Sequence, residues 1–309
     1  MSRLTRLILS SLTALTLASC FTGIESTPKI TSGDVRRRQT QTVAEDAFLA
    51  DVGGTRPSLW TAGKRFCVTD DKIAIIFTVN SDNKDSLAGH ELLFRSFEPV
   101  SSLTGEGSTD IVLTSDRGDD LHYVVNVPYD ELMKRERFDI PFTVESAVVD
   151  SFNTSMSGNR YYITTPKWYD NTTGKELKAL RHIPVTIGSV TPGNSVYPLK
   201  VTFTTDSVPG EHYVLMTYGR DKASTRNFNK LFAFDNPRDK YTRISDRTWQ
   251  LIIHSKVEEG MTRDECHLAL GTPNSIKTVP TNAAVYEQWS YDDGVYLIFE
   301  DNILTRFRV

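Results

Sequence analysis

One segment of the chain recurs farther along the sequence, and this repeat constrains the fold more than any other feature. Residues 63–72 align with residues 158–167 at an offset of 95, and four of the ten aligned positions are identical. At two further positions Phe and Tyr, or Val and Ile, replace one another. The alignment places Gly63 over Gly158, and it suggests that the chain contains two copies of one unit.

A second match follows in the same order. The segment that ends at Asp116, with His122 after it, aligns with the segment that ends at Asp206, with His212 after it, at an offset of 90. Changes in loop length shift such an offset by a few residues without changing the order. We therefore predict two tandem β modules over residues 57–147 and 148–235, with His122 over His212.

The middle of the chain has the composition of an all-β region. Runs rich in β-branched and aromatic residues are separated by clusters of Gly, Asn, Asp and Ser. We predict strands at 73–79, 122–127 and 161–164. Each module is expected to close as a small barrel or sandwich, because a short open sheet leaves unpaired edges.

The carboxy-terminal residues 236–309 have a different pattern. Trp249, Ile252 and Ile253 have helical spacing behind Ser245 or Asp246 as the N-cap. A second helix is delimited at both ends. Thr262 and Glu265 form a capping box at its start, and Gly271 followed by Pro273 stops it.

Three strands are expected after these helices, at 285–291, 295–300 and 303–309. The pairs Asp293-Gly294 and Asp301-Asn302 lie where tight hairpin turns belong. The predicted fold is therefore mostly β with a C-terminal α+β domain. Two tandem barrel or sandwich modules precede two helices on a three-stranded antiparallel meander.

Four short motifs in this region resemble the SmpA/OmlA (BamE-like) family of small outer-membrane lipoproteins. The residues that carry the resemblance are Gly260, Met261 and Thr262, then Gly271 and Pro273 in Leu-Gly-Thr-Pro, then Trp289 and Tyr291, and lastly Phe299 in an apolar strand. The resemblance covers about 240–309. It implies a non-enzymatic protein-interaction module, of the kind found in an accessory subunit of the machinery that folds outer-membrane β-barrels and in proteinaceous enzyme inhibitors. Two modules precede the domain here, which leaves the partner open.

The first residues have the pattern of a secretory signal. Two arginines precede a short apolar run, and the run ends in Leu-Ala-Ser before Cys20. This ending resembles the lipobox of bacterial lipoproteins. The resemblance implies a signal peptide over 1–19 and a diacylglycerol, with fatty acids such as palmitate, on the Cys20 sulfur. An ordinary cleaved signal is the alternative. Residues 20–56 read as a disordered tether, with a short helix at 43–49 as an option.

Charge and location follow from this assignment. Arg3 and Arg6 are the charged residues of 1–19, so the remaining chain has 33 basic and 39 acidic residues, a formal charge of −6. An acidic chain without a basic stripe is a poor nucleic-acid binder. We expect a lipid-anchored cell-envelope protein. Phe21 follows the cysteine in place of the Asp associated with inner-membrane retention, which favours the outer membrane.

The sequence contains no recognisable catalytic, cofactor or metal motif. Cys266 and His267 are neighbours on one predicted helix, so their side chains diverge. Cys67 and Cys266 are read as separate thiols, with a disulfide as the alternative. We predict that the protein is not an enzyme. A ligand-binding lipoprotein remains the rival interpretation, with Trp60 and Trp168-Tyr169 stacking on a glycan or peptide.

Strand alternation separates two faces of the predicted meander. Trp289 and Phe299 are its bulkiest apolar residues, so their face is expected against the helices. The other face then exposes Tyr286, Tyr296 and Ile298, with Arg306 or Phe307 beside them. Because Tyr and Arg are common in binding hot spots, we predict that this face binds a protein partner of the envelope.

Overall fold

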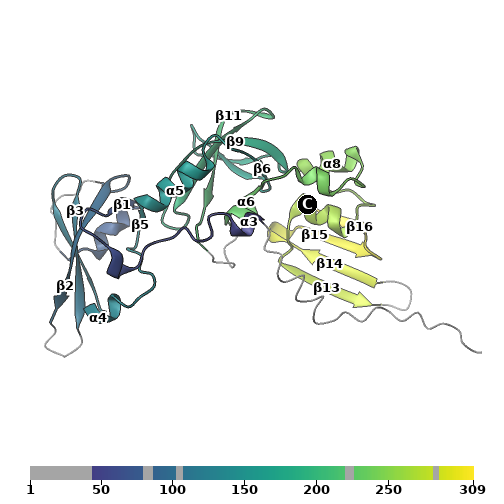
Figure 1. Cartoon of the computed structure of the whole chain (residues 1–309). Coiled ribbons are helices and arrows are strands. Elements are labelled where there is room, and N and C mark those ends of the chain that lie inside the picture. Colours follow the sequence, from purple (N-terminus) through teal and green to yellow (C-terminus); the bar gives the residue numbers. More distant parts are fainter. Residues whose placement is uncertain (1–43, 79–85, 102–106, 220–225, 281–284) are drawn as a thin grey trace, which may run out of the picture. The chain divides into compact units, whose positions relative to one another are not determined.

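The computed structural model describes residues 44–78, 86–101, 107–219, 226–280 and 285–309. The predicted signal peptide, the lipidation site at Cys20 and the tether up to residue 43 lie outside these residues. Strands dominate the described chain and form three antiparallel sheets (Figure 1). No helix among the described residues is long and apolar enough to cross a membrane.

The first sheet has five strands in the order β4-β3-β2-β1-β5. Its strands are β1 (Arg65–Val68), β2 (Glu91–Val100), β3 (Ser108–Ser115), β4 (Asp120–Val125) and β5 (Thr143–Glu145). The helical segments nearby are η1 (Pro57–Leu59), η2 (Asp71–Ile76) and α4 (Tyr129–Leu132). Alternate strand residues such as Phe66, Leu92 and Leu113 point to one side and form a core with Trp60 and Ile140.

The second sheet has seven strands in the order β12-β6-β9-β10-β11-β7-β8. Its strands are β6 (Arg160–Ile163), β7 (Lys167–Asp170), β8 (Glu176–Lys178), β9 (Ile183–Pro192), β10 (Leu199–Thr205), β11 (Val208–Met216) and β12 (Phe232–Ala233). Helix α5 (Ser146–Met156) packs against β9. Its residues Val148, Val149, Phe152 and Met156 are buried at helical spacing and share a core with Phe203.

The two sheets share one strand order. The sequence β4-β3-β2-β1-β5 in the first corresponds to β11-β10-β9-β6-β12 in the second, and the β7–β8 hairpin is added beside β11. Gly63 and Gly158 precede the equivalent strands β1 and β6, and both have positive φ angles, 87° and 76°. Only glycine adopts this conformation without strain. The common order is what tandem copies of one module require.

The expected superposition of His122 on His212 is wrong by one residue. His212 lies opposite Phe203 in β10, faces the core and is buried. His122 lies opposite Val112 in β3, on the other face of its strand, where its Nδ1 is 2.7 Å from Asp110 Oδ2. Because side chains alternate along a strand, a one-residue difference in register reverses the face.

Two other expectations need correction in these modules. Each module was expected to be a barrel or a sandwich; neither strand order closes on itself in the described sheets, so the barrel alternative is wrong. Residues 73–76 of the predicted strand at 73–79 belong to the short helix η2, and residue 79 lies outside the described residues. Hydrogen bonds to two aspartates support this conformation. The side chain of Asp70 accepts a hydrogen bond from the backbone N–H of Lys72, and Asp71 accepts others from Leu87 and Ala88.

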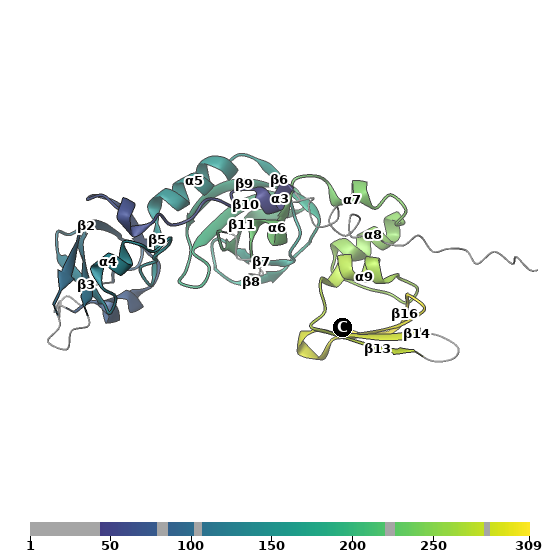
Figure 2. The ribbon, with the colours of Figure 1, turned by 60° about the horizontal axis from the view of Figure 1, so that its bottom comes forward.

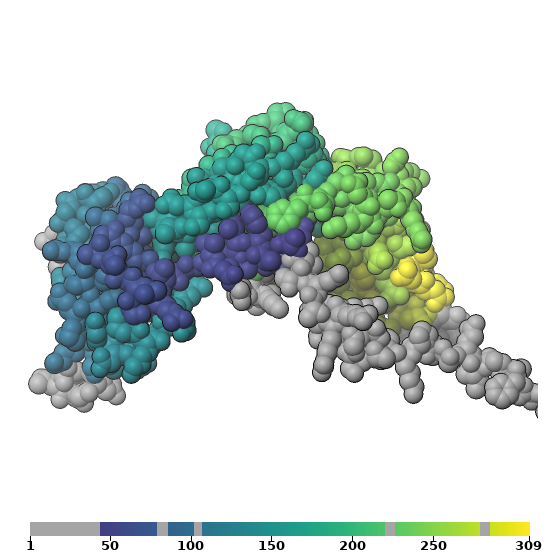
Figure 3. Space-filling model, viewed as in Figure 1, coloured from purple at the N-terminus to yellow at the C-terminus, as the bar shows by residue number. Residues whose placement is uncertain are grey.

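The predicted tether also extends too far at its carboxyl end. Helix α3 (Ala44–Ala47) begins a packed segment, shown in purple in Figure 3. The ring of Phe48 lies 4.5 Å from that of Phe228, and the buried Glu45 accepts a hydrogen bond from the N–H of Phe234. Phe228 belongs to α6 (Phe228–Leu231). Residues 44–56 are therefore part of the folded unit.

The C-terminal domain places two helices on one side of a sheet, as Figure 2 shows. Its helices are α8 (Asp246–Ile253) and α9 (Arg263–Leu270), with the short α7 (Pro237–Lys240) before them. Its strands are β13 (Ser275–Pro280), β14 (Val285–Ser290), β15 (Tyr296–Glu300) and β16 (Ile303–Arg308), with η3 (Asp292–Gly294) between β14 and β15. The expected two helices and three strands are present. The expectation missed β13, which makes the sheet four-stranded.

The predicted caps of this domain are confirmed. Ser245 caps α8, and the side chain of Thr262 accepts a hydrogen bond from Glu265 N while Glu265 Oε2 accepts one from Thr262 N at 2.7 Å. Gly271 ends α9 with a φ of 86°. Both predicted hairpin turns have residues with positive φ, among them Asp293 and Asn302.

Two residues of the second module contact the last turn of α9. Arg181 Nη1 donates to the carbonyl of Ala269 at 2.7 Å, and His182 Nε2 donates to that of Leu268 at 3.0 Å. Helix-terminal carbonyls carry partial negative charge, which suits these donors. Both side chains are buried. Burial lowers the pKa of Arg181 to about 10, and burial together with the Arg181 charge lowers the pKa of His182 to about 4.

Candidate interaction surface

The inner face of the C-terminal sheet is the face that carries α8 and α9. One row across it joins Ile276, Trp289, Leu297 and Phe307 on the four strands in turn. Trp289 and Leu297 on the central strands are buried, whereas Ile276 and Phe307 on the edge strands are exposed. In this row the helices therefore cover the two central residues and leave the side chains of Ile276 and Phe307 exposed.

A buried polar group supports the same core. Glu287 forms an ion pair with Arg263 of α9, and its Oε1 accepts a hydrogen bond from Trp289 Nε1 at 2.5 Å. The hydroxyl of Tyr291 donates to the carbonyl of Gly271 at 3.2 Å, which connects β14 to the end of α9. The motif residues Thr262, Gly271 and Trp289 thus have clear structural roles.

The outer face, on the opposite side of the sheet, carries the four residues expected at the interaction surface. Gln288, Ile298 and Arg306 form one row, and Tyr296 lies two residues from Ile298 on the same strand. The face includes Lys277, Tyr286, Gln288, Tyr296, Ile298, Glu300, Ile303, Arg306 and Arg308. Tyr286 is 38% exposed. Phe307, the alternative to Arg306, pairs with Leu297 and belongs to the inner face.

The outer face is predominantly basic. Lys277, Arg306 and Arg308 are exposed, and within the described chain none of them forms an ion pair. Glu300 is the one acidic member of the face. Its charge and a hydrogen bond to it hold the pKa of Tyr286 above its usual range. The face thus combines three cations that form no ion pair within the described chain with two tyrosines and an isoleucine.

The sequence did not indicate all of this face. Lys277 lies on β13, which is not among the predicted strands, and the sequence pattern assigns Arg308 to no face. The alternation in 285–291 and 295–300 was enough to find Tyr286, Tyr296 and Ile298. The pairing of Lys277 with Gln288 becomes visible when β13 is recognised as a strand.

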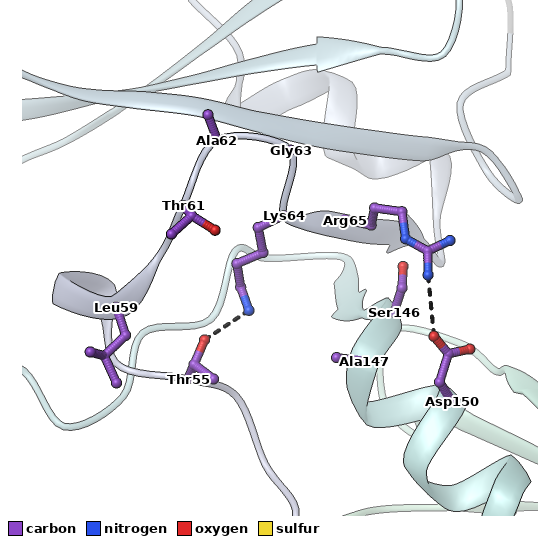
Figure 4. A pocket seen from close by; sticks show the side chains of 10 residues that line it. All are labelled: Thr55, Leu59, Thr61, Ala62, Gly63, Lys64, Arg65, Ser146, Ala147 and Asp150. Carbon is purple, nitrogen blue, oxygen red and sulfur yellow. Dashed lines mark hydrogen bonds and ion pairs between the residues drawn. The ribbon is translucent and has the colours of Figure 1, made fainter.

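A shallow depression lies at the start of α5 in the first module (Figure 4). Its volume is about 360 Å³, and Lys64 and Arg65 are its cationic residues. Lys64 Nζ lies 2.5 Å from Glu145 Oε2, and Arg65 forms ion pairs with Glu91 and Asp150. Because neighbouring carboxylates neutralise both cations, this depression offers little to a charged ligand.

The aromatic residues proposed as a stacking platform are placed differently. Trp60 and Trp168 are buried in the cores of the two modules, so neither is available to a glycan or peptide. Tyr169 is partly exposed and stacks on Tyr213 of β11, with ring centroids 5.1 Å apart. Lys200 Nζ lies 4.4 Å from the centroid of Tyr213. This platform consists of two rings, Tyr169 and Tyr213.

The two cysteines do not form a disulfide, and His267 is directed away from its neighbour Cys266. Cys67 and Cys266 are unpaired, as the sequence favoured. Burial raises the pKa of Cys266 to about 12, and His267 turns to Thr272, with its Nε2 3.2 Å from the threonine hydroxyl. Cys67 Sγ lies 3.2 Å from the hydroxyl of Ser146, and burial raises its pKa as well.

Comparison of the chain with models of protein families, with curated proteins and with solved structures finds no match.

Proposed function

We propose that this chain is a non-enzymatic envelope lipoprotein that binds a protein partner through the outer face of its C-terminal sheet. The observation that carries the proposal is the outer face itself. One side of the sheet is covered by α8 and α9, and the other combines Tyr286, Tyr296 and Ile298 with three cations that form no ion pair within the described chain. Such a combination of rigid aromatic and cationic side chains is frequent at protein interfaces.

The membrane attachment is proposed from the sequence. The apolar run before Cys20 and the small residues next to it suit lipid modification of the cysteine and attachment to the outer membrane. Together with the resemblance of residues 240–309 to the SmpA/OmlA (BamE-like) family, this favours a scaffold or assembly factor of the outer membrane. The modules between the tether and the interaction domain act as a spacer in this proposal.

Site-specific photo-cross-linking in intact cells tests the partner-binding role. A photoreactive phenylalanine analogue replaces Tyr286, and a matched control replaces Val196, which is 67% exposed on the second module. We expect Tyr286 to cross-link to a defined protein partner and Val196 not to do so. The additional change Arg306→Glu should reduce the Tyr286 cross-link. Identical products from both positions, or none from Tyr286, would argue against the proposal.

A further inference from the structure

The two edges of the C-terminal sheet differ in their main-chain partners. On the side away from β15, the first residues of the edge strand β16 form main-chain contacts with residues 260–262. Gly260 N donates to Leu304 O, Leu304 N donates to Met261 O, and Thr262 forms a β-bridge with Ile303. At the other edge, β13 pairs with β14, and no further strand adjoins it in the described chain. The sheet therefore has one open edge along a whole strand.

Along β13 an exposed apolar side chain and an exposed charged side chain point to opposite faces of the sheet. Residues Ser275, Ile276, Lys277 and Thr278 are all exposed. Ile276 points to the inner face and is 52% exposed, beyond the reach of the helices. Lys277 points to the outer face in the row of Gln288 and Arg306. An open strand with an uncovered apolar residue and an unpaired cation is a template for another strand.

We propose that β13 is the acceptor edge for an extended strand of a partner protein in which acidic and apolar side chains alternate. This inference rests on the proposed function and specifies how the partner engages the domain. Main-chain hydrogen bonds to β13 extend the sheet to a fifth strand. An acidic side chain of the partner then lies beside Lys277, and an apolar side chain covers Ile276.

Charge decides which strand is accepted. Lys277 and Arg306 lie in one row of the outer face, and β13 has no acidic residue that could neutralise their positive charges. A strand with a cation beside Lys277 is disfavoured, because like charges in neighbouring strands repel. Pairing with β13 of a second copy brings two copies of Lys277 close together, so self-association is less favourable than binding of an acidic strand.

A synthetic peptide tests the inference on the full chain. The probe is a fluorescent peptide of about ten residues in which Val and Glu alternate, and its binding is measured by fluorescence anisotropy. We expect saturable binding, and we expect N-methylation of alternate backbone amides to weaken it more than about tenfold, because strand addition needs those N–H groups. The change Lys277→Glu should weaken binding about threefold to fivefold, and a Val–Lys peptide should bind the Lys277→Glu chain better than it binds the original chain.

Matched variants separate this inference from the proposed function. Ile276→Ala should weaken peptide binding, whereas Ile303→Ala at the opposite edge and Lys256→Glu in the loop before α9 should not. Circular dichroism checks that each variant stays folded. Equal binding of the N-methylated peptide, or insensitivity to Ile276→Ala and Lys277→Glu, overturns the edge inference and leaves the outer-face proposal standing.

Two further results also have defined meanings. A dimer in sedimentation that Ile276→Ala dissociates would overturn the inference in favour of a second copy as the occupant. Peptide binding at β13 without any cross-link from Tyr286 would support the edge and refute the outer face as the partner surface.

Discussion

The ring centroids of Trp289 and Phe299 are 4.8 Å apart, and both rings lie between the C-terminal sheet and its helices. Trp289 is 6% exposed and Phe299 is fully buried. Trp289→Ala should therefore destabilise the domain by about 3–5 kcal/mol, through lost burial and the cavity that remains. Thermal unfolding followed by circular dichroism measures the change. The double variant Tyr286→Ala with Tyr296→Ala serves as the control and should cost much less; the reverse order would mean that the faces are exchanged.

A second prediction concerns the buried ion pair of the first module. Glu145 Oε1 accepts a hydrogen bond from Thr55 N at 2.9 Å, and Oε2 lies 2.5 Å from Lys64 Nζ. Because the Lys64 and Glu145 side chains are both largely buried, Glu145→Ala leaves an unpaired charge and should cost about 3–5 kcal/mol in unfolding free energy. The exposed pair of Arg65 and Asp150 is the comparison, and Asp150→Ala should cost less than about 1 kcal/mol. Equal losses in urea titrations would contradict this assignment.

The third prediction is a pH dependence at His182. Its pKa is lowered from 6.5 to about 4 in the folded chain, so the unfolded chain binds the proton more readily. Stability is unaffected well above pH 6.5, and it falls as the pH drops from about 6.5 to about 4, by about 3 kcal/mol at most. His182→Asn should remove this step, since asparagine tolerates the positive φ of 57° at this position. Melting temperatures of both proteins across this range decide the matter, and parallel curves would refute it.

The fourth prediction concerns thiol reactivity. The thiolate is the reacting species, and burial raises the pKa of both Cys67 and Cys266, the latter to about 12. At pH 8, iodoacetamide should modify the half-buried Cys67 slowly and the buried Cys266 scarcely at all. Mass spectrometry of tryptic peptides reads the extent of reaction. Both cysteines should react fully once the chain is unfolded in urea, which serves as the control. Fast labelling of Cys266 in the folded chain would show that the buried face of α9 is accessible to solvent.

The fifth prediction addresses the proposed anchor. Cys20→Ala should abolish incorporation of a fatty-acid analogue and leave the chain as an unprocessed precursor or as released protein, because the sulfur of Cys20 is the proposed lipid acceptor. Metabolic labelling followed by membrane fractionation measures both effects. Cys67→Ala is the matched control and should be labelled like the original chain. Undiminished label in the Cys20→Ala protein would exclude the proposed modification.

Local signals made much of the C-terminal domain predictable. The capping box at Thr262 and Glu265, the stop at Gly271 and the turn at Asp301-Asn302 act within a few residues, so the sequence displays them directly. The alternation that separates Trp289 from Tyr286 is equally local. Tyr286, Tyr296 and Ile298 therefore lie on the face where the alternation predicts them, and the pairing of Ile298 with Arg306 decides between Arg306 and Phe307.

The missed features depend on contacts that are distant in the sequence. Helix α5 contains Val148, Val149 and Thr154, and its N-cap residue Glu145 makes no side-chain capping bond, so packing against β9 decides its conformation. Strand β13 ends at Pro280, and its pairing with β14 defines it. The one-residue difference between His122 and His212 is a matter of register between strands, which similarity along one strand does not report.

The C-terminal sheet joins each strand to the next one along the chain, from β13 through β16. Contacts of this kind close small loops, and chains rich in them cross the folding barrier quickly. The bridge between Thr262 and Ile303 and the hydrogen bonds of Gly260 and Met261 to Leu304 close much longer loops, so they are expected to form after the hairpins. A chain that emerges unfolded from a translocation channel would complete this domain soon after strand β16 is released. Little time then remains in which the exposed strands of nascent molecules could pair with one another.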